Sequence, residues 1–526
     1  MTSIAEGGPN SLQALEAQYG PNYRWLVITA AITGTFGQVL SSTTINVAIP
    51  EIMGTFGLGH DQAQWLATGF LASTTVCMLL AAWFTERFGF RATFIGAIVV
   101  CEIGGIMGGF APNEDVLIVA RVLQGAASGI IQPMTMLLVF QVFPADRRGS
   151  AMGVFAIGTV LAPALGPTFA GMLMDQLSWR FVFFMATPFD FIGLLMAMVF
   201  IPGKLATTHR RFDWAGTILI TLGVALLLVA LSRGQRDGWL ADNVLVYFLA
   251  ASGVLVVFVA WQLHVAQPLI NLRIFLNGRF AAAAFVSFVI GVALFGSTYL
   301  IPLFVQEVQG LTPTDAGLLL LPAGLAIGLS FPITGRLADL WPPYVLIYIG
   351  LGLSALSCLL LAGADADTGF WTLVLWTIFG RLGFAFIFPA LGIGSLKVLP
   401  LHFLAQGSGI INFTRQLGGA FGVNLLASAL IARSAFHAEG FTADQTADNQ
   451  TMMELARQLQ HLFARLGTPD IQQFPAAMQY IGRMIGAQAN LLGYQDGFMI
   501  LGITGIVAMV PAMLMITKPT KRPVAA

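Results

Sequence analysis

A small set of charged side chains lies inside long apolar stretches, and these residues are the first candidates for chemistry. The bases are Arg121, Arg381 and Arg415, and the acids are Glu102, Asp190 and Glu307. A charge within an apolar helix is costly and usually faces a cavity or a polar partner. A buried acid can also bind and release protons near neutral pH, because burial disfavours its charged form. These residues therefore predict a polar pathway through an otherwise apolar protein.

The composition indicates what kind of protein must position these side chains. Of 526 residues, 57% are hydrophobic and 10% are charged, whereas a soluble domain has about 25% charged residues. The apolar residues form runs long enough to cross a bilayer as helices, which takes about 20 residues. Only helices and closed barrels satisfy their backbone in lipid, and barrel strands alternate over about 10 residues. The sequence therefore predicts an all-α integral membrane protein.

The apolar runs predict fourteen transmembrane helices. Their expected ranges are 25–49, 62–84, 92–111, 116–141, 149–173, 179–201, 212–232, 242–263, 280–307, 313–335, 343–363, 370–395, 404–432 and 496–517. Most of the 25 lysine and arginine residues then fall on one side of the membrane. Basic residues accumulate on the cytoplasmic side, so we expect both termini to be cytoplasmic.

Patterns typical of several other functional classes are missing from the sequence. The three cysteines lie inside apolar runs, and the six histidines lie in loops or at helix ends. Neither a disulfide framework nor a metal or nucleophile cluster is indicated. No phosphate-binding G-x-x-x-x-G-K-[ST] loop occurs, so a gradient must drive any transport. We expect no catalytic residues, metal, cofactor or nucleic-acid partner; a membrane-embedded enzyme is the alternative from another class.

Two cytoplasmic turns share a pattern of small, acidic and basic residues. The first, AWFTERFGFR at 82–91, contains Glu86 and Arg87, and the second, GRLADLW at 335–341, contains Asp339. Both resemble the G-x-L-A-D-R-x-G-R-K loop that occurs once in each half of major facilitator superfamily proteins. The resemblance implies two six-helix repeats and a cytoplasmic latch at these three residues. An ordinary polar turn is the alternative.

Further motifs narrow the resemblance. They are LSSTTINVAIP at 40–50, RVLQG at 121–125, APALGP at 162–167 and NFTR at 412–415. Together they are similar to the fourteen-helix drug/proton antiporters of the EmrB and QacA type, over about residues 25–517. This implies two six-helix bundles plus two inserted central helices. The expected domains are a cytoplasmic segment 1–24, an N-terminal bundle 25–201, an inserted pair 202–278, a C-terminal bundle 279–517 and a cytoplasmic tail 518–526.

The resemblance also implies roles for single residues. In this family the stretch that holds Pro163, Gly166, Pro167 and Gly171 is associated with exporters; close packing or bending of a helix is the alternative. The arginine of R-x-x-Q-G, here Arg121, is implicated in proton coupling. A structural arginine that binds backbone carbonyl groups is the alternative.

The chain departs from its family at the end of the first span. The family pattern L-D-x-T has an acid where this chain has Ser41. Because serine does not titrate near neutral pH, either another acid (Glu102, Asp190 or Glu307) carries the proton, or the coupling differs from that of the family. Glu102 can equally be a neutral, hydrogen-bonded acid. Asp190 follows Pro188 and is more simply explained as an acceptor for backbone donors at a kink, and Glu307 can reach the outer membrane surface.

A substrate cavity is expected between the two bundles near the middle of the membrane. Its candidate residues are Ser41, Asn46, Gln124, Arg381, Asn412 and Arg415. If the arginines line it, the cavity favours anionic amphiphiles over lipophilic cations. We therefore expect a proton-coupled exporter of amphiphilic small molecules in a bacterial inner membrane. A proton-coupled importer and a lipid or siderophore exporter of the same fold are the alternatives.

The outer loop 435–495 has a pattern of its own. Apolar residues recur at spacings of three and four over 452–466 and again over 474–485, which indicates two amphipathic helices. In the resembling subfamily a similar insertion occurs in pumps that work with a periplasmic adaptor protein. We therefore expect an adaptor as a partner, besides substrate, protons and membrane lipid. Helices that lie on the membrane or cap the outer gate are the alternative.

Overall fold

The computed structural model describes residues 12–58, 60–203, 211–443, 445 and 449–516, and all regular elements in these ranges are helices. The expected cytoplasmic tail 518–526 and the first part of the segment 1–24 lie outside these ranges. The rest of that segment contains a short helix, α1 (Leu12–Tyr19), which packs beneath the bundle through the rings of Tyr19 and Phe200.

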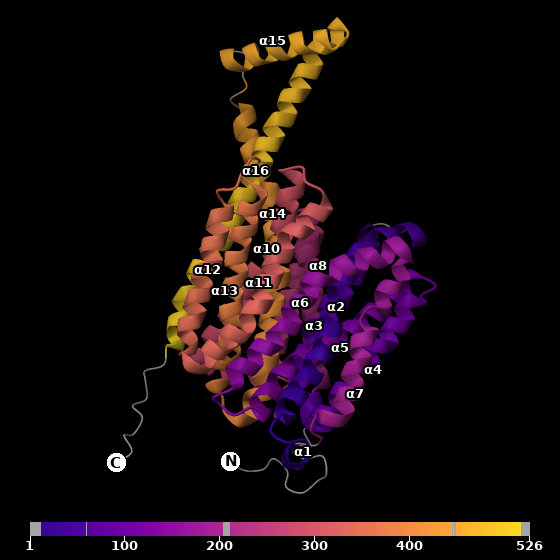
Figure 1. Cartoon of the computed structure of the whole chain (residues 1–526). Coiled ribbons are helices and arrows are strands. Elements are labelled where there is room, and N and C mark those ends of the chain that lie inside the picture. Colours follow the sequence, from indigo (N-terminus) through magenta and orange to yellow (C-terminus); the bar gives the residue numbers. More distant parts are fainter. Residues whose placement is uncertain (1–11, 59, 204–210, 444, 446–448, 517–526) are drawn as a thin grey trace, which may run out of the picture.

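The membrane helices form two groups (Figure 1). The first comprises α2 (Tyr23–Phe56), α3 (His60–Phe88), α4 (Phe90–Gly109), α5 (Glu114–Val142), α6 (Arg148–Gln176) and α7 (Thr187–Phe200). The second comprises α10 (Gly278–Glu307), α11 (Pro313–Leu340), α12 (Pro343–Leu361), α13 (Phe370–Lys397), α14 (Leu404–Ala443) and α16 (Asp470–Ala512).

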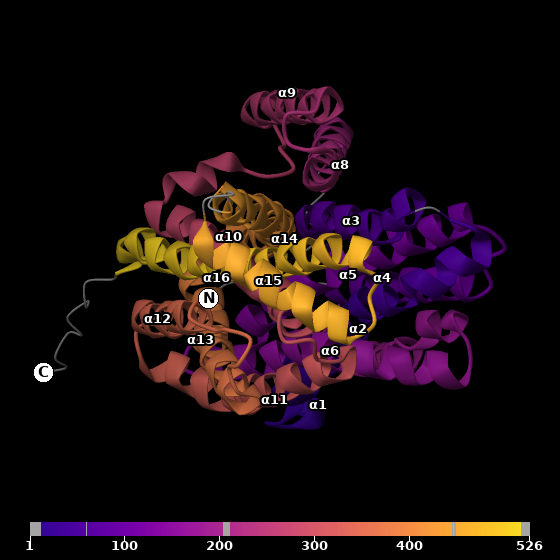
Figure 2. The same ribbon diagram turned by 90° about the horizontal axis from the view of Figure 1, so that it is seen from above.

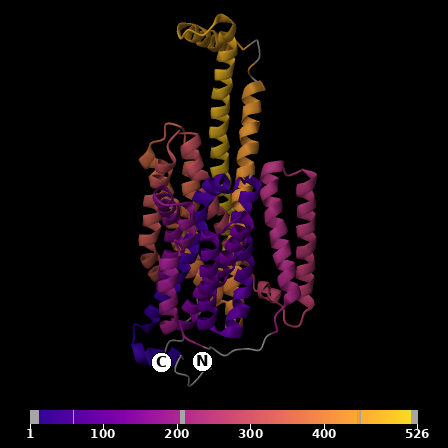
Figure 3. The ribbon, with the colours of Figure 1, turned by 90° about the vertical axis from the view of Figure 1, so that its right-hand side faces the viewer.

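Two further membrane helices, α8 (Trp214–Asp237) and α9 (Asp242–His264), form a hairpin at one side of the bundle (Figures 2 and 3). Helix α8 packs on α3 and α14, whereas α9 packs mainly on α8 and exposes side chains such as Leu249 and Val256. In the described ranges, 13 segments are long and apolar enough to cross a membrane, and α6 is a further helix of 29 residues. The prediction of fourteen spans in an all-α fold is confirmed.

The predicted span 179–201 is not one continuous helix. It begins with a 3-10 helix, η1 (Trp179–Phe184), and α7 starts only at Thr187. The buried Trp179 ring packs on Phe56 of α2 and thereby anchors η1 to that helix. Within η1 it also packs on Phe183. Pro188 then lies in the first turn of α7, where proline lacks only an N–H that would have no helical partner. The break therefore follows from one aromatic anchor and one proline.

The outer loop is largely helical and stands away from the membrane helices (Figures 1 and 3). The first predicted amphipathic helix is α15 (Gln450–Arg465), but the second is not separate, because 474–485 belongs to the 43-residue helix α16. Ala456 and Leu459 of α15 pack against Ala477 and Ile481 of α16. The two apolar stripes therefore bury one another.

The two groups of helices meet where glycines allow close approach. A Cβ at Gly153 of α6 would lie 3.0 Å from the Cα of Gly335 in α11, and a Cβ at Gly409 of α14 would lie 2.6 Å from the carbonyl oxygen of Met78 in α3. Only a residue without a side chain fits such backbone contacts. The pairs α6–α11 and α3–α14 thus form the seam between the groups.

Candidate functional site

Arg415 lies at the seam between the two groups of helices. Its Nη2 donates a 2.6 Å hydrogen bond to Asn412 Oδ1, and its guanidinium carbon lies 5.2 Å from the centroid of the Phe388 ring on α13. Asn412 Nδ2 in turn donates to the Ser408 carbonyl and lies 3.5 Å from Met136 Sδ of α5. Side chains from α5, α13 and α14 therefore surround one half-buried positive charge.

No acidic oxygen of the described residues forms an ion pair with Arg415 within 4.0 Å. Its charge is balanced by an amide oxygen and by the negative face of an aromatic ring. Such a group can accept a carboxylate, because Arg presents several N–H donors in a fixed fork.

Arg121 has quite different surroundings from Arg415. It is 2% exposed, and its guanidinium donates to the carbonyl oxygens of Leu66 and Ser41, at 3.3 and 3.1 Å. It also donates to Gln124 Oε1 at 2.9 Å and lies 4.2 Å from the centroid of the Phe70 ring. These contacts join α5 to α2 and α3. Neighbouring helices therefore enclose its side chain.

The remaining cavity candidates are dispersed. Arg381 is 8% exposed and donates to Thr298 Oγ1 at 2.9 Å, inside the second group of helices. Ser41 is buried, and its carbonyl group, not its hydroxyl, binds Arg121. Asn46 lies in α2, but its side chain is outside the described part of the structure. Of the five expected cavity residues whose side chains the structure describes, Asn412 and Arg415 lie together at the seam.

Two of the three candidate acids lie close together inside the first group of helices. Asp190 of α7 is fully buried, and its Oδ2 accepts from Gln38 Nε2 of α2 at 3.1 Å. Glu102 of α4 is half-buried, accepts from Thr187 Oγ1 at 2.9 Å, and interacts electrostatically with Asp190. Neither acid forms an ion pair with a base of the described residues.

Asp190 does not serve a helix kink, which was the favoured explanation for it. Its Oδ2 accepts from the Gln38 side chain on α2, its carboxyl also interacts with Cys101 and Glu102 of α4, and its Oδ1 is buried without a geometric hydrogen-bond partner among the described residues. Gln38 Oε1 is also buried without a partner. Gly37 provides the space, since a Cβ there would lie 2.5 Å from Asp190 Oδ1.

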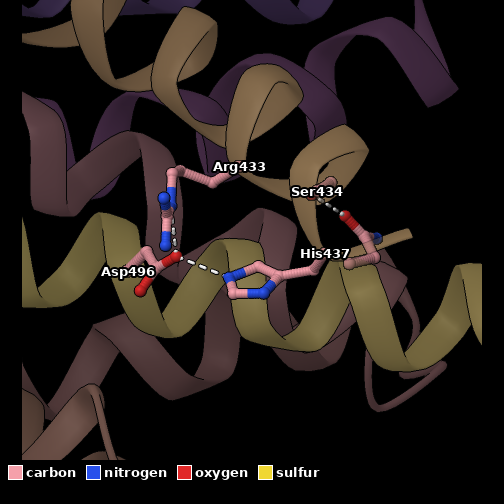
Figure 4. Close-up of polar contacts among 5 residues, drawn as sticks. Arg433, Ser434, His437 and Asp496 are labelled. Carbon is pink, nitrogen blue, oxygen red and sulfur yellow. Dashed lines mark hydrogen bonds and ion pairs between the residues drawn. The ribbon is translucent and has the colours of Figure 1, made fainter. Parts of the chain in front are cut away.

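Glu307 lies apart from this acid pair, at the end of α10 near the outer loop. Its Oε2 accepts from Tyr494 at 2.8 Å and from Asn490 at 3.3 Å. Close by, Asp496 Oδ2 of α16 accepts from Arg433 Nε at 2.6 Å and lies 2.8 Å from His437 Nε2, both on α14 (Figure 4). These contacts hold the outer parts of α10, α14 and α16 together.

The acid of the turn 335–341 binds a helix end across the seam. Asp339 Oδ1 accepts from the Gly149 backbone N–H at 2.5 Å, and its Oδ2 accepts from the backbone N–H and hydroxyl of Ser150 at 2.9 and 2.7 Å. These groups form the first turn of α6, where unpaired N–H groups and the helix dipole favour an anion. Asp339 therefore links the two groups through backbone amides rather than through a basic side chain.

The other predicted motif residues are only partly described. Glu86 and Arg87 lie in the last turn of α3. Gly166 is buried in α6, which continues as a helix through the whole APALGP stretch. The side chains of Pro163 and Pro167, and Gly171 beyond its helical backbone, lie outside the described part.

The sequence analysis did not single out four residues that contact these candidates. Gln38 and Thr187 contact the acids Asp190 and Glu102, and Met136 and Phe388 contact Asn412 and Arg415. Gln38 is a polar residue within an apolar run, so its type was a usable signal. Thr187, Met136 and Phe388 are ordinary residues of membrane helices, and only the fold brings them to their partners.

Comparisons with known proteins agree with this architecture. The family model described as Major Facilitator Superfamily matches residues 31–423. The uncharacterized MFS-type transporter YcnB of Bacillus subtilis is 32% identical over 416 residues, 79% of this chain and 88% of YcnB. The lincomycin resistance protein LmrB of Listeria monocytogenes is 28% identical over 449 residues, 85% of this chain and 95% of LmrB. The multidrug export protein EmrB of Haemophilus influenzae is 27% identical over 491 residues, 92% and 95% of the two chains.

Solved structures with the same fold include transporters of different solutes. The human organic anion transporter MFSD10 (TETRAN) has a TM-score of 0.60 and 14% identity, and the match covers 92% of this chain and 100% of that chain. The proton:xylose symporter XylE has a TM-score of 0.59 and 13% identity, with 93% and 95% covered. Identities this low indicate a shared fold and leave the substrate open.

Proposed function

The chain belongs to the major facilitator superfamily and is a multi-pass transporter of a bacterial inner membrane, and from this premise we propose that it is a proton-coupled exporter of amphiphilic carboxylates. The observation that carries the proposal is the separation of its intramembrane charges. Arg415 lies at the seam without an acid, whereas Asp190 and Glu102 lie inside the first group of helices without a base. A substrate site and a proton site are thus available at different places.

The proton site of this proposal is the pair Asp190 and Glu102. A carboxylate without a cation beside it is strongly disfavoured in apolar surroundings, so Asp190 holds a proton at rest. Asp190 Oδ1 is buried without a geometric hydrogen-bond partner among the described residues, and a proton there removes an uncompensated charge. Glu102 interacts with Asp190 and is less buried. Glu307 is less suited, because it lies at the outer end of α10.

The substrate site of this proposal is centred on Arg415. Its free N–H groups can bind a carboxylate, while Phe388 and Met136 offer apolar contacts for the rest of an amphiphile. We propose that the bundles 25–201 and 279–517 rock around this site, with Asp339 closing the seam at the end of α6. Export is favoured by the relatives named for lincomycin resistance and multidrug export.

The test is uptake into inside-out vesicles under an imposed proton gradient. We expect an amphiphilic carboxylate to accumulate and a lipophilic cation of similar size not to. Arg415→Gln should lower carboxylate accumulation about tenfold, since a hydrogen bond to a charged group contributes roughly 1.5–3 kcal/mol. Arg457→Gln is the matched control, because Arg457 is exposed on α15 far from the seam.

Three outcomes would contradict different parts of the proposal. Accumulation of the cation with no carboxylate transport would contradict the assigned substrate class. Gradient-driven accumulation in right-side-out vesicles only would make the protein an importer. Equal accumulation in the Arg415→Gln variant and the wild type would remove Arg415 from the substrate site.

A further inference from the structure

A cavity of about 680 Å³ lies at one end of the second group of helices. This end is on the same side of the molecule as α1 (Figure 1). It lies where α10 and α12 begin and where α13 and α16 end. The residues that line it are Leu276, Asn277, Gly278, Arg279, Pro343, Gly394, Lys397, Val398, Leu514 and Met515. All of them belong to one group of helices, so the cavity lies outside the seam through which substrate would pass.

The charged lining of the cavity is entirely cationic. Arg279 and Lys397 are its only ionisable lining residues, and both side chains are exposed. Asn277 fixes their relative position, because its side chain accepts from the Arg279 backbone N–H and donates to the Val398 carbonyl, both at 3.1 Å. The start of α10 is thereby bound to the end of α13, and the two cations share one rim.

The wall of the cavity is apolar and extends toward the lipid. Leu276 and Leu514 are 84% and 61% exposed, whereas Met515 is 7% exposed and forms part of the floor. Gly394 leaves the floor open, since a Cβ there would lie 3.1 Å from Pro343 Cβ and 3.2 Å from Met515 Cε. A cationic rim above an apolar wall at the membrane surface complements an anionic head group joined to an acyl chain.

We propose that this cavity binds an anionic phospholipid of the surrounding membrane. The phosphate lies between Arg279 and Lys397, and an acyl chain follows Leu276 and Leu514. A soluble anion would satisfy the cations but leave these two exposed side chains without an apolar partner. The inference does not depend on the substrate, the direction of transport or the side of the membrane on which this end lies.

The test is lipid binding to the purified full-length protein in detergent, measured by native mass spectrometry. Phosphatidylglycerol and phosphatidylcholine with identical acyl chains are added separately, and inorganic phosphate is added as a competitor. The test variant is Arg279→Gln with Lys397→Gln. The control variant is Arg211→Gln with Arg273→Gln, which removes two exposed cations that do not line the cavity.

The wild type and the control should bind one phosphatidylglycerol at least tenfold more tightly than the test variant, with phosphatidylcholine bound weakly by all three. The proposal would be overturned if the test variant bound phosphatidylglycerol as tightly as the wild type does. It would also be overturned if the wild type bound phosphatidylcholine as tightly as phosphatidylglycerol. Displacement of the lipid by millimolar phosphate would assign the site to a soluble anion instead. As a second measurement, Gly394→Leu, which fills the floor, should also abolish tight binding while the melting temperature reports whether it folds.

Discussion

Arg121 and Arg415 are both arginines within apolar helices, yet the fold gives them different surroundings. Arg121 is enclosed by two backbone carbonyls, Gln124 and Phe70, whereas Arg415 has one amide oxygen and an aromatic ring at the seam. The sequence predicts that both lie within membrane helices. It does not predict their different surroundings, because the carbonyl groups that bind Arg121 lie 55 and 80 residues away along the chain.

Asp213 provides a residue-scale prediction outside the membrane-spanning segments, since it immediately precedes the span that begins at Trp214. Burial by itself raises the pKa of its carboxyl, but hydrogen bonds from Gly216, Trp261, Gln262 and Leu269 outweigh burial and hold the pKa below its ordinary value. Its contribution to stability is therefore present above the unfolded pKa, about 3.9, and is lost as the pH falls through the lower folded value.

Asp213→Asn should accordingly lower the melting temperature in detergent at pH 7. The difference from the wild type should begin to shrink as the pH falls below about 4, where the unfolded carboxyl is protonated, and should disappear once the pH falls below the lower folded-state pKa. Asp367→Asn, an exposed acid in the 361–370 connection, is the control and should show no difference. A difference that stays constant down to the lowest pH would refute the electrostatic origin of the effect.

At the scale of elements, the apolar runs were sufficient to predict the membrane helices. The break between η1 and α7 was missed, because Trp179 and Pro188 look like ordinary residues of an apolar run. The continuity of α16 was missed for a related reason. The sequence predicted an amphipathic helix over 474–485 but not that it continues into the membrane span, because the polar residues between the two were assigned to the outer loop.

The contact between α11 and α6 carries the element-scale prediction. Asp339→Asn removes the anion at the α6 start and replaces one acceptor with a donor that faces backbone N–H groups. We expect the population of molecules in which the start of α6 and the end of α11 are separated, relative to those in which they are in contact, to rise at least about fivefold. The reason is that hydrogen bonds to a charged group contribute roughly 1.5–3 kcal/mol. Spin labels at the exposed positions Pro144 and Leu340, in a background without the three native cysteines, report this separation by pulsed electron paramagnetic resonance.

Asp146→Asn is the matched control for this experiment. Its carboxylate is exposed and lies 4.0 Å from Arg147 Nε, beside the same helix start but not across the seam. The control should leave the distance distribution unchanged. An unchanged distribution in Asp339→Asn as well would show that this contact does not hold the seam closed.

At the scale of the whole molecule, the sequence predicted the superfamily, and the family model and relatives confirm it. The motifs also led to Asp339 and Arg415, whose contacts cross or line the seam. The pairing of Asp190 with Glu102 could not be predicted, because helices α4 and α7 meet only in the folded bundle. The serine at position 41, where the family has an acid, is the reason to propose a proton site elsewhere.

The central claim is that the proton is held at Asp190 and Glu102, apart from the substrate at Arg415. The most direct measurement compares gradient-driven accumulation with gradient-free substrate exchange in proteoliposomes containing Asp190→Asn. Our account predicts that this variant exchanges substrate within about twofold of the wild type but accumulates no more with a proton gradient than without one. Accumulation equal to that of the wild type, with Asp367→Asn as the control for the substitution, would contradict the account.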